Sequence, residues 1–258
     1  MLTRVFGIMI FCCSLSYASF TSYTDIHDFA GTPTDGANSN SSLFQASNGL
    51  VYGMAQFGGT FNDGIIFSFD PANVAGTYTI IHSFSSSPDG ASTPGSLFQA
   101  SNGLIYGMTQ FGGMFLDGTI FSFDPANVAG TYTIIHNFGS GTDGQVPFGS
   151  LFQASNGLIY GMTQSGGTFS HGIIFLFDPA NVAGTYANIH NFGSGTDGSR
   201  PFGSLFQAGN GLLYGTAFEK GAIGSPPGNG MMFSIFVPLA ERAFRRSSAP
   251  GGYRPRGR

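Results

Sequence analysis

Short apolar runs separated by glycine-rich turns recur along this chain at a fixed spacing. The leucine of the segment Ser-Leu-Phe-Gln at 42–45 returns as Leu97, Leu151 and Leu205, each time 54 residues further on. Residues 42–84 and 96–138 match at 37 of 43 positions. Such a period indicates tandem copies of one supersecondary unit.

Each unit contains four strand-like runs. Asn102-Gly103 between two apolar runs is a strong hairpin signal, because both residue types tolerate a positive φ. Asp124-Pro125 ends the third run, since proline lacks the N–H that a strand ladder needs. In the second copy the predicted strands are 96–100, 104–109, 119–123 and 132–138.

Four antiparallel strands in a unit of this length are typical of a β-propeller blade. Runs such as 64–69 are almost continuously apolar, which indicates sheets that are buried on both faces. The pattern therefore predicts an all-β fold, a β-propeller of four blades of about 54 residues with four antiparallel strands each.

The phase of the repeat predicts how the ring ends. Residues 23–29 align with the fourth-strand residues 78–84, and the last unit stops after a third-type strand at 231–236. If the N-terminal strand pairs with the last blade, the ring closes and no sheet edge stays open. The alternative is an open arc or part of a larger propeller.

The composition indicates an apolar core, and the first residues indicate an export signal. Only 9% of residues are charged, but 28 Phe and 10 Tyr supply apolar bulk. Residues 1–18, with Arg4, an apolar stretch at 5–15 and Ser16-Tyr17-Ala18, are typical of a signal peptide. A retained membrane anchor is the alternative. We expect a propeller at 19–238, a disordered basic tail at 239–258, and a secreted, periplasmic or surface location in a bacterium.

The cysteine content and the charge exclude several kinds of site and partner. Cys12 and Cys13 both lie in the predicted signal peptide, so the mature chain has no disulfide, thiol nucleophile or zinc–thiolate site. Residues 19–238 carry 12 acidic residues against Arg200 and Lys220, which excludes nucleic acid as a partner. No other apolar run is long enough to cross a bilayer, so we expect no transmembrane segment in the mature chain.

The repeat motifs resemble a known family. Ile-His-Asn-Phe at 135–138, Asp143-Gly144, Pro-Phe-Gly-Ser-Leu at 147–151, Asn-Gly-Leu-Ile-Tyr-Gly-Met-Thr at 156–163 and Gly166-Gly167 are similar to the GloVer tandem repeat of exported bacterial proteins. The resemblance covers about residues 22–237. It implies an exported, propeller-like protein and supplies no catalytic residue. This chain differs in having a longer third-to-fourth connection and no hydrophobic anchor after Pro238.

Repeated aspartates form the candidate ligand-binding site. One set precedes glycine in the loop between the fourth strand and the next first strand, and consists of Asp35, Asp89, Asp143 and Asp197. Asp-Gly is ordinary turn chemistry. The functional alternative is an acidic ring at one mouth of the central channel, joined by Asp63 and Asp117, which attracts cations or basic partners. We favour the turn interpretation. No copy has the ligand pattern of a calcium loop.

Histidines also recur, but we expect no metal site from them. His27, His82, His136 and His190 share one position in the fourth strand, the outer strand of a blade. Outer-strand histidines are far apart around a ring, so packed or hydrogen-bonded imidazoles are expected. Asp70, Asp124 and Asp178, each before proline, are interpreted as strand terminators at the opposite end.

Near-identical units do not favour catalysis, which needs different groups converging on one point. We therefore expect a monomeric, non-enzymatic binding or surface scaffold without a cofactor, acting on an unknown protein or glycan ligand. The alternative is a propeller hydrolase or lyase acting on extracellular glycans. Such an enzyme needs two carboxylates in one non-repeated pocket, and Glu219 is the one glutamate between residues 19 and 238.

Overall fold

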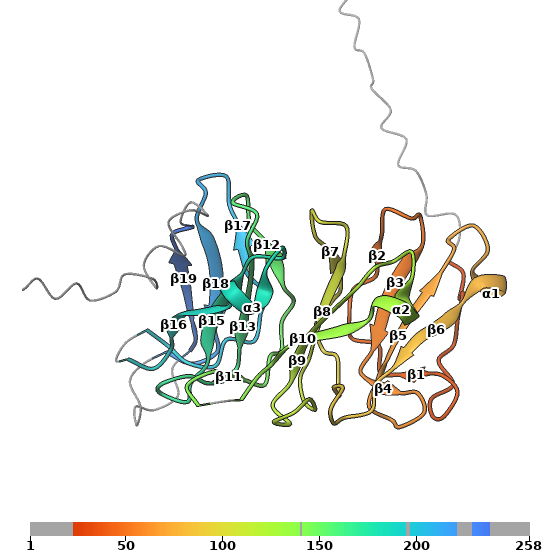
Figure 1. Cartoon of the computed structure of the whole chain (residues 1–258), viewed down its shortest axis with the longest axis horizontal. Coiled ribbons are helices and arrows are strands. Elements are labelled where there is room, and N and C mark those ends of the chain that lie inside the picture. The colour runs from red at the N-terminus through yellow and green to blue at the C-terminus, as the bar shows by residue number, and fades with distance from the viewer. Residues whose placement is uncertain (1–22, 140, 195–196, 221–228, 238–258) are drawn as a thin grey trace, which may run out of the picture.

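A computed structural model describes residues 23–139, 141–194, 197–220 and 229–237. The fold is all-β, built from repeated antiparallel sheets that stand side by side in a row (Figure 1). The first sheet has the order β2-β3-β5-β6, in which each strand pairs with its neighbours in sequence. Its strands are β2 (Phe44–Gln45), β3 (Val51–Ala55), β5 (Ile65–Phe69) and β6 (Thr79–Ser83).

The next two repeats form sheets of the same kind. The second sheet contains β7 (Phe98–Gln99), β8 (Ile105–Thr109), β9 (Thr119–Phe123) and β10 (Thr133–Asn137). The third contains β12 (Phe152–Gln153), β13 (Ile159–Thr163), β15 (Ile173–Phe177) and β16 (Ala187–Asn191). The last sheet has three strands among the described residues, β17 (Phe206–Gln207), β18 (Leu213–Ala217) and β19 (Met231–Ile235).

The predicted strands of the second copy are found, with one shortened. β9 coincides with the predicted third strand, and β8 and β10 each start one residue later than predicted. The predicted first strand, 96–100, is reduced to the two residues of β7. Repeated four-stranded antiparallel sheets are therefore confirmed.

The connection between the third and fourth strands holds a short helical turn that the sequence pattern did not predict. The three turns are α1 (Val74–Thr77), α2 (Val128–Thr131) and α3 (Val182–Thr185). Asn73 caps the first, its side chain accepting from the N–H of Gly76 at 3.3 Å. An asparagine N-cap satisfies a helix-end donor that otherwise has no partner.

Two-residue ladders tie the loops together at the end of the sheets opposite the helical turns. β1 (Gly36–Ala37) pairs with β4 (Phe57–Gly58), and β11 (Gly144–Gln145) pairs with β14 (Ser165–Gly166). Each joins the loop that precedes the first strand to the loop between the second and third strands.

The core lies between the sheets. Tyr52, Met54 and Ile66 of the first sheet pack with Phe121 and Phe123 of the second, all nearly fully buried. Equivalent clusters lie between the second and third sheets and between the third and fourth. Because neighbouring sheets cover both faces, the strands need apolar residues at successive positions, as the continuous runs predict.

One glycine in each second strand is required by this packing. A Cβ atom at Gly107 would collide with the ring of Phe121 and with Leu97 of the same sheet. Only glycine lets the large ring lie across the neighbouring strand, so the Tyr-Gly pair of each repeat is a packing signal.

The predicted ring closure is not present in the structure. Residues 23–29 form no strand; Phe29 instead packs its ring on Phe67 of the first sheet, with centroids 5.4 Å apart. Among the described residues β19 pairs with β18 alone. Figure 1 shows the first and last sheets at opposite ends of the row. The predicted signal peptide 1–18 and basic tail 239–258 lie outside the described residues. Within the described ranges no helix is long and apolar enough to cross a membrane.

Candidate functional site

Each predicted Asp-Gly aspartate lies against the repeated histidine seven or eight residues before it in the chain. In each pair the imidazole Nε2 approaches one carboxylate oxygen, Oδ2. The four distances are 2.9 Å for His27–Asp35, 2.8 Å for His82–Asp89, 2.8 Å for His136–Asp143 and 3.1 Å for His190–Asp197. His27, His82 and His136 are hydrogen-bonded within the fold, as the structural interpretation of the sequence expected, and His190 lies within ion-pair distance of Asp197.

A tyrosine of the following repeat completes three of these pairs. Its hydroxyl donates to the other carboxylate oxygen, Oδ1, and its ring stacks on the imidazole with centroids 3.8 Å apart. The hydroxyl–carboxylate distances are all 2.7 Å, for Tyr78–Asp35, Tyr132–Asp89 and Tyr186–Asp143. We call each such group a His–Asp–Tyr set.

The sets join one sheet to the next at the edge that carries the fourth strand. His136 belongs to β10, whereas Tyr186 immediately precedes β16 of the third sheet. Asp143 bridges the two and also accepts from the N–H of Gly144 at 2.7 Å. The carboxylates thus lie beside the fourth strands, whereas a mouth around a propeller axis would be lined from the first-strand edge. Turn formation is only part of what these aspartates do.

The surroundings of the His–Asp–Tyr sets shift the pKa values of Asp35 and of the tyrosines. Burial by itself raises the pKa of Asp35, but hydrogen bonds to its carboxylate, the strongest from Tyr78, outweigh burial and bring the pKa below its ordinary value. Burial raises the pKa of Tyr132 and Tyr186 far above the ordinary tyrosine value, and the adjacent carboxylates add to the rise. These phenols therefore remain protonated donors at any physiological pH.

The fourth pair has no tyrosine among the described residues. Asp197 accepts instead from the N–H of Gly193 at 3.0 Å and the hydroxyl of Ser194 at 3.1 Å. Its side chain and that of His190 are more exposed than their counterparts in the second and third pairs. The last set is incomplete.

The second group of predicted site residues, Asp63 and Asp117, lies where loops of successive repeats meet. The backbone O of Asp63 accepts from the N–H of Ser92 at 2.8 Å. The corresponding distance is 2.9 Å for Asp117 with Val146. Burial and then the charge of Asp89 raise the pKa of Asp63.

The residues that donate these loop hydrogen bonds share an unusual backbone. Ser92, Val146 and Arg200 have φ of 59°, 56° and 53°, and Asn38 takes the same place in the first repeat with φ of 53°. The sequence pattern does not predict this position, because its residue type changes in every copy. A β-branched Val146 in this region is uncommon, and the contact with the neighbouring loop holds it there.

His171 and Glu219 occupy the same loop in the later repeats. The carbonyl of His171 accepts from the N–H of Arg200 at 2.9 Å. Glu219 accepts from the hydroxyl of Ser199 at 2.8 Å and lies 3.4 Å from the guanidinium of Arg200. Within the described part of the chain, no three His, Cys, Asp or Glu side chains cluster in a way that could hold a metal ion.

The Asp-Pro aspartates lie at the other end of the sheets, between the third strands and the helical turns. Oδ1 of Asp70 accepts from the N–H of Ala72, and the N–H of Asp70 donates to the hydroxyl of Thr77, both at 2.8 Å. Asp124 and Asp178 make the same contacts. These hydrogen bonds fit the prediction that the residues end the strand.

A polar ladder along the first strands was also missed from sequence. The N–H of Ser42 donates to the hydroxyl of Ser96, and the N–H of Ser96 donates to that of Ser150, each at 2.8 Å. Gln99 similarly accepts from the N–H of Ser47 at 2.8 Å. The recurrence of Ser-Leu-Phe-Gln was visible, but its contacts cross between repeats.

A shallow groove of about 450 Å³ lies beside one complete set. Asp89, Met114, Tyr132 and Asn137 contribute to its walls. It is open to solvent and combines an apolar methionine with polar groups, which suits surface contact with a macromolecule more than enclosure of a small molecule.

The repeats of this chain match one family model. The model of the Gloeobacter/Verrucomicrobia repeat matches residues 10–175 and 73–243, which together cover most of the chain. The chain belongs to this repeat family. The family membership confirms the resemblance seen in the sequence motifs. A search of curated proteins finds no match.

Comparison with solved structures finds distant likenesses. An endo-arabinase from Bacteroides thetaiotaomicron is 16% identical to this chain, with a TM-score of 0.42. The match covers 76% of this chain and 74% of the arabinase. A PL25 ulvan lyase is 13% identical, with coverages of 72% and 48% and a TM-score of 0.46. A GH43 endo-arabinanase from Bacillus licheniformis is 15% identical, with coverages of 75% and 72% and a TM-score of 0.39.

Proposed function

We propose that this chain is an exported, non-enzymatic binding or surface scaffold whose ligand is an extracellular protein or glycan. One observation carries the proposal: the repeated carboxylates and imidazoles, which have the chemistry for catalysis, are used to hold sheets together. Asp143, for example, accepts from His136, Tyr186 and Gly144 at once. What remains for a ligand is a surface of equivalent, repeated positions, as in other solenoid-like arrays.

We take the row of sheets as part of a propeller and not as a closed four-bladed ring. In a propeller, stacked blades present their connecting loops on two opposite surfaces. Such loops vary without disturbing the core and are the usual place for recognition. The chain varies most in this way at 218–230, where the last repeat has four extra residues.

Export is part of the proposal and has its own test. The signal peptide predicted at residues 1–18 should be removed during secretion. Expression in a bacterial host, followed by N-terminal sequencing of the protein outside the cytoplasm, should give a chain beginning at Ser19. A retained leader would support the membrane-anchor alternative.

Binding and turnover are separated by one assay. The purified chain is run by affinity electrophoresis through gels containing different extracellular polysaccharides, and the same mixtures are assayed for new reducing ends and unsaturated products. We expect retardation by at least one polymer, or capture of an exported protein partner, without product formation. Product that forms with the parent chain and disappears in Glu219→Gln would overturn the scaffold proposal in favour of a glycan-cleaving enzyme.

A further inference from the structure

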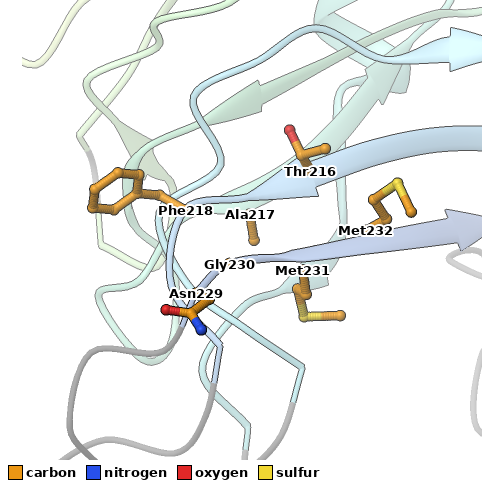
Figure 2. Close-up of a pocket in the computed structure, with 7 residues that line it drawn as sticks. All are labelled: Thr216, Ala217, Phe218, Asn229, Gly230, Met231 and Met232. Atoms are coloured by element: carbon orange, nitrogen blue, oxygen red, sulfur yellow. The ribbon is translucent and has the colours of Figure 1, made fainter.

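The outer face of the last sheet has the residues of a buried interface but no neighbouring sheet among the described residues. Tyr214 is 37% exposed, whereas its counterpart Tyr160 is fully buried. Met232 is 82% exposed, whereas Ile174 at the same repeat position is fully buried. Figure 2 shows Met232 and Thr216 on one side of β18 and β19, beside an open pocket of about 760 Å³. Exposed apolar surface of this kind marks an interaction site.

The outer face of the first sheet is uncovered in the complementary way. Leu43 is 52% exposed, whereas its counterpart Leu97 is 4% exposed because the first sheet covers it. Leu43, Phe29, Phe67 and Phe69 line an apolar hollow of about 140 Å³. Inside the row, the ring of Tyr52 fills the equivalent space against Phe123, with centroids 6.1 Å apart.

A polar partner is missing at each end as well. Tyr23 aligns with Tyr78 of the first His–Asp–Tyr set, but it is 93% exposed and contacts no aspartate among the described residues. His190 and Asp197 form the one pair to which no tyrosine is added within the described ranges. The unused tyrosine and the incomplete pair lie at opposite ends of the row.

Backbone pairing follows the same pattern. In the complete sheets the third strand pairs with a fourth, for example Ser68 opposite Thr79. β19 has no fourth strand beside it within the described residues. Residues 23–29 have the sequence of a fourth strand, and no third strand from the described part of the chain lies beside them. Unpaired strand edges are templates for another chain.

We propose that a second copy of this chain docks head to tail on the last sheet. Residues 23–29 of the second copy become the fourth strand on β19, and its first sheet covers Tyr214 and Met232. In the register of the complete sheets, Thr24 of the second copy lies opposite Ser234. Tyr23 of the second copy then stacks on His190 and donates to Asp197, which completes the fourth set.

A second copy fits better than closure within one chain. Residues 23–29 are fixed to the first sheet, because His27 binds Asp35 at 2.9 Å and stacks on Tyr78 at 3.8 Å. With that segment in place, the first and last sheets stand at opposite ends of the row (Figure 1). Two copies related by a twofold axis cover both ends at once and leave no free edge. The proposal thus replaces the monomer expected from the sequence.

The direct test is a disulfide between the proposed partners. Thr24→Cys and Ser234→Cys are combined in a chain whose Cys12 and Cys13 are replaced by serine. We expect a disulfide that joins two chains, seen as a doubled mass on a non-reducing gel. Ser68→Cys with Thr79→Cys is the matched control, because this pair is opposed within one sheet and should close within one chain. Either single Thr24→Cys or Ser234→Cys variant should give no defined dimer.

Light scattering of the unmodified full chain supplies an independent measurement. We expect a species of two copies at micromolar concentrations, reduced at least tenfold in apparent association constant by Met232→Lys and by Tyr23→Ala. Leu116→Lys, at an exposed leucine in the loop between β8 and β9 of the second sheet, should leave association unchanged. A Thr24–Ser234 disulfide formed within one chain, or a single-chain mass at all concentrations with no disulfide, would overturn the proposal.

Discussion

The third and fourth sheets are equivalent units of the repeat in different surroundings. Every residue of β13 and β15 is buried, because a sheet lies against each face. In β18 and β19 burial alternates from residue to residue, because one face is open. Burial in this fold therefore depends on the neighbouring sheet, and the strand's own sequence determines it only in part.

The sequence of the last sheet responds to this difference at only some positions. Thr216 replaces the methionine of earlier copies. Tyr214 and Met232 remain exposed. A face adapted fully to water would have lost these two residues as well, so the last sheet retains the composition of an interface.

The largest contrast should come from truncating the two equivalent core positions. Ile174→Ala should cost about 2–5 kcal/mol, because the cavity lies between two packed sheets. Met232→Ala should change stability by less than about 0.5 kcal/mol in dilute protein, since its side chain is exposed. Urea denaturation at low concentration measures both. Equal losses would mean that the last sheet is covered within a single chain.

The His–Asp–Tyr sets give the next contrast. Asp143→Asn should cost about 1.5–3 kcal/mol, because it weakens charge-assisted hydrogen bonds from His136 and Tyr186. Asp197→Asn should cost less, since its set has no tyrosine. Turn chemistry alone predicts that both substitutions are mild, because asparagine serves an Asx turn equally well. Thermal unfolding of the two variants separates these accounts: equally small shifts would show that the sets add little.

Alkaline pH should weaken the complete sets. The pKa of Tyr132 is raised in the folded protein, whereas an unfolded tyrosine ionises near pH 10. Below about pH 10 both states are protonated, and above it only the unfolded state loses the proton, so stability falls as pH rises. Tyr132→Phe should make this fall shallower. A melting-temperature series from pH 8 to 11 measures it, and an unchanged slope would contradict the assignment.

Acid pH should give the smallest effect. The pKa of Asp35 is lowered in the folded state, so its contribution is complete above the unfolded value of about 4 and is lost as pH falls through the folded value. Asp35→Asn should therefore flatten the dependence of the melting temperature on pH below about pH 4. A variant with the parent's dependence would show that the carboxylate is not stabilised by its donors.

Local patterns predicted the strands well and the partners between repeats poorly. β9 was placed correctly because Thr119 begins an apolar run and Asp124-Pro125 ends it. The helical turn α1 was missed, although Asn73 before Val74 is an N-cap signal. Residues 23–29 were expected to form a strand, but a strand needs a partner, and none of the described strands lies beside them.

The contact partners of the candidate site residues were also not predictable from local sequence. Asp-Gly indicated turns, but Gly36 and Gly144 begin the short strands β1 and β11. The tyrosine that binds Asp35 is 43 residues away and belongs to the next sheet. No local pattern gives that contact. The joint recurrence of His, Asp and Tyr in successive repeats was the available signal, and its failure at Asp197 points to the open end.

Hydrogen exchange of β19 and residues 23–29 as a function of concentration tests the central claim most directly. If the outer edge of β19 and residues 23–29 are free in a single chain, their amides should exchange quickly in dilute protein. Both segments should become protected together as concentration rises, while β15 stays protected throughout. Protection of both segments at every concentration would show pairing within one chain, and absence of protection at every concentration would show that these edges do not pair. Either result would contradict the account.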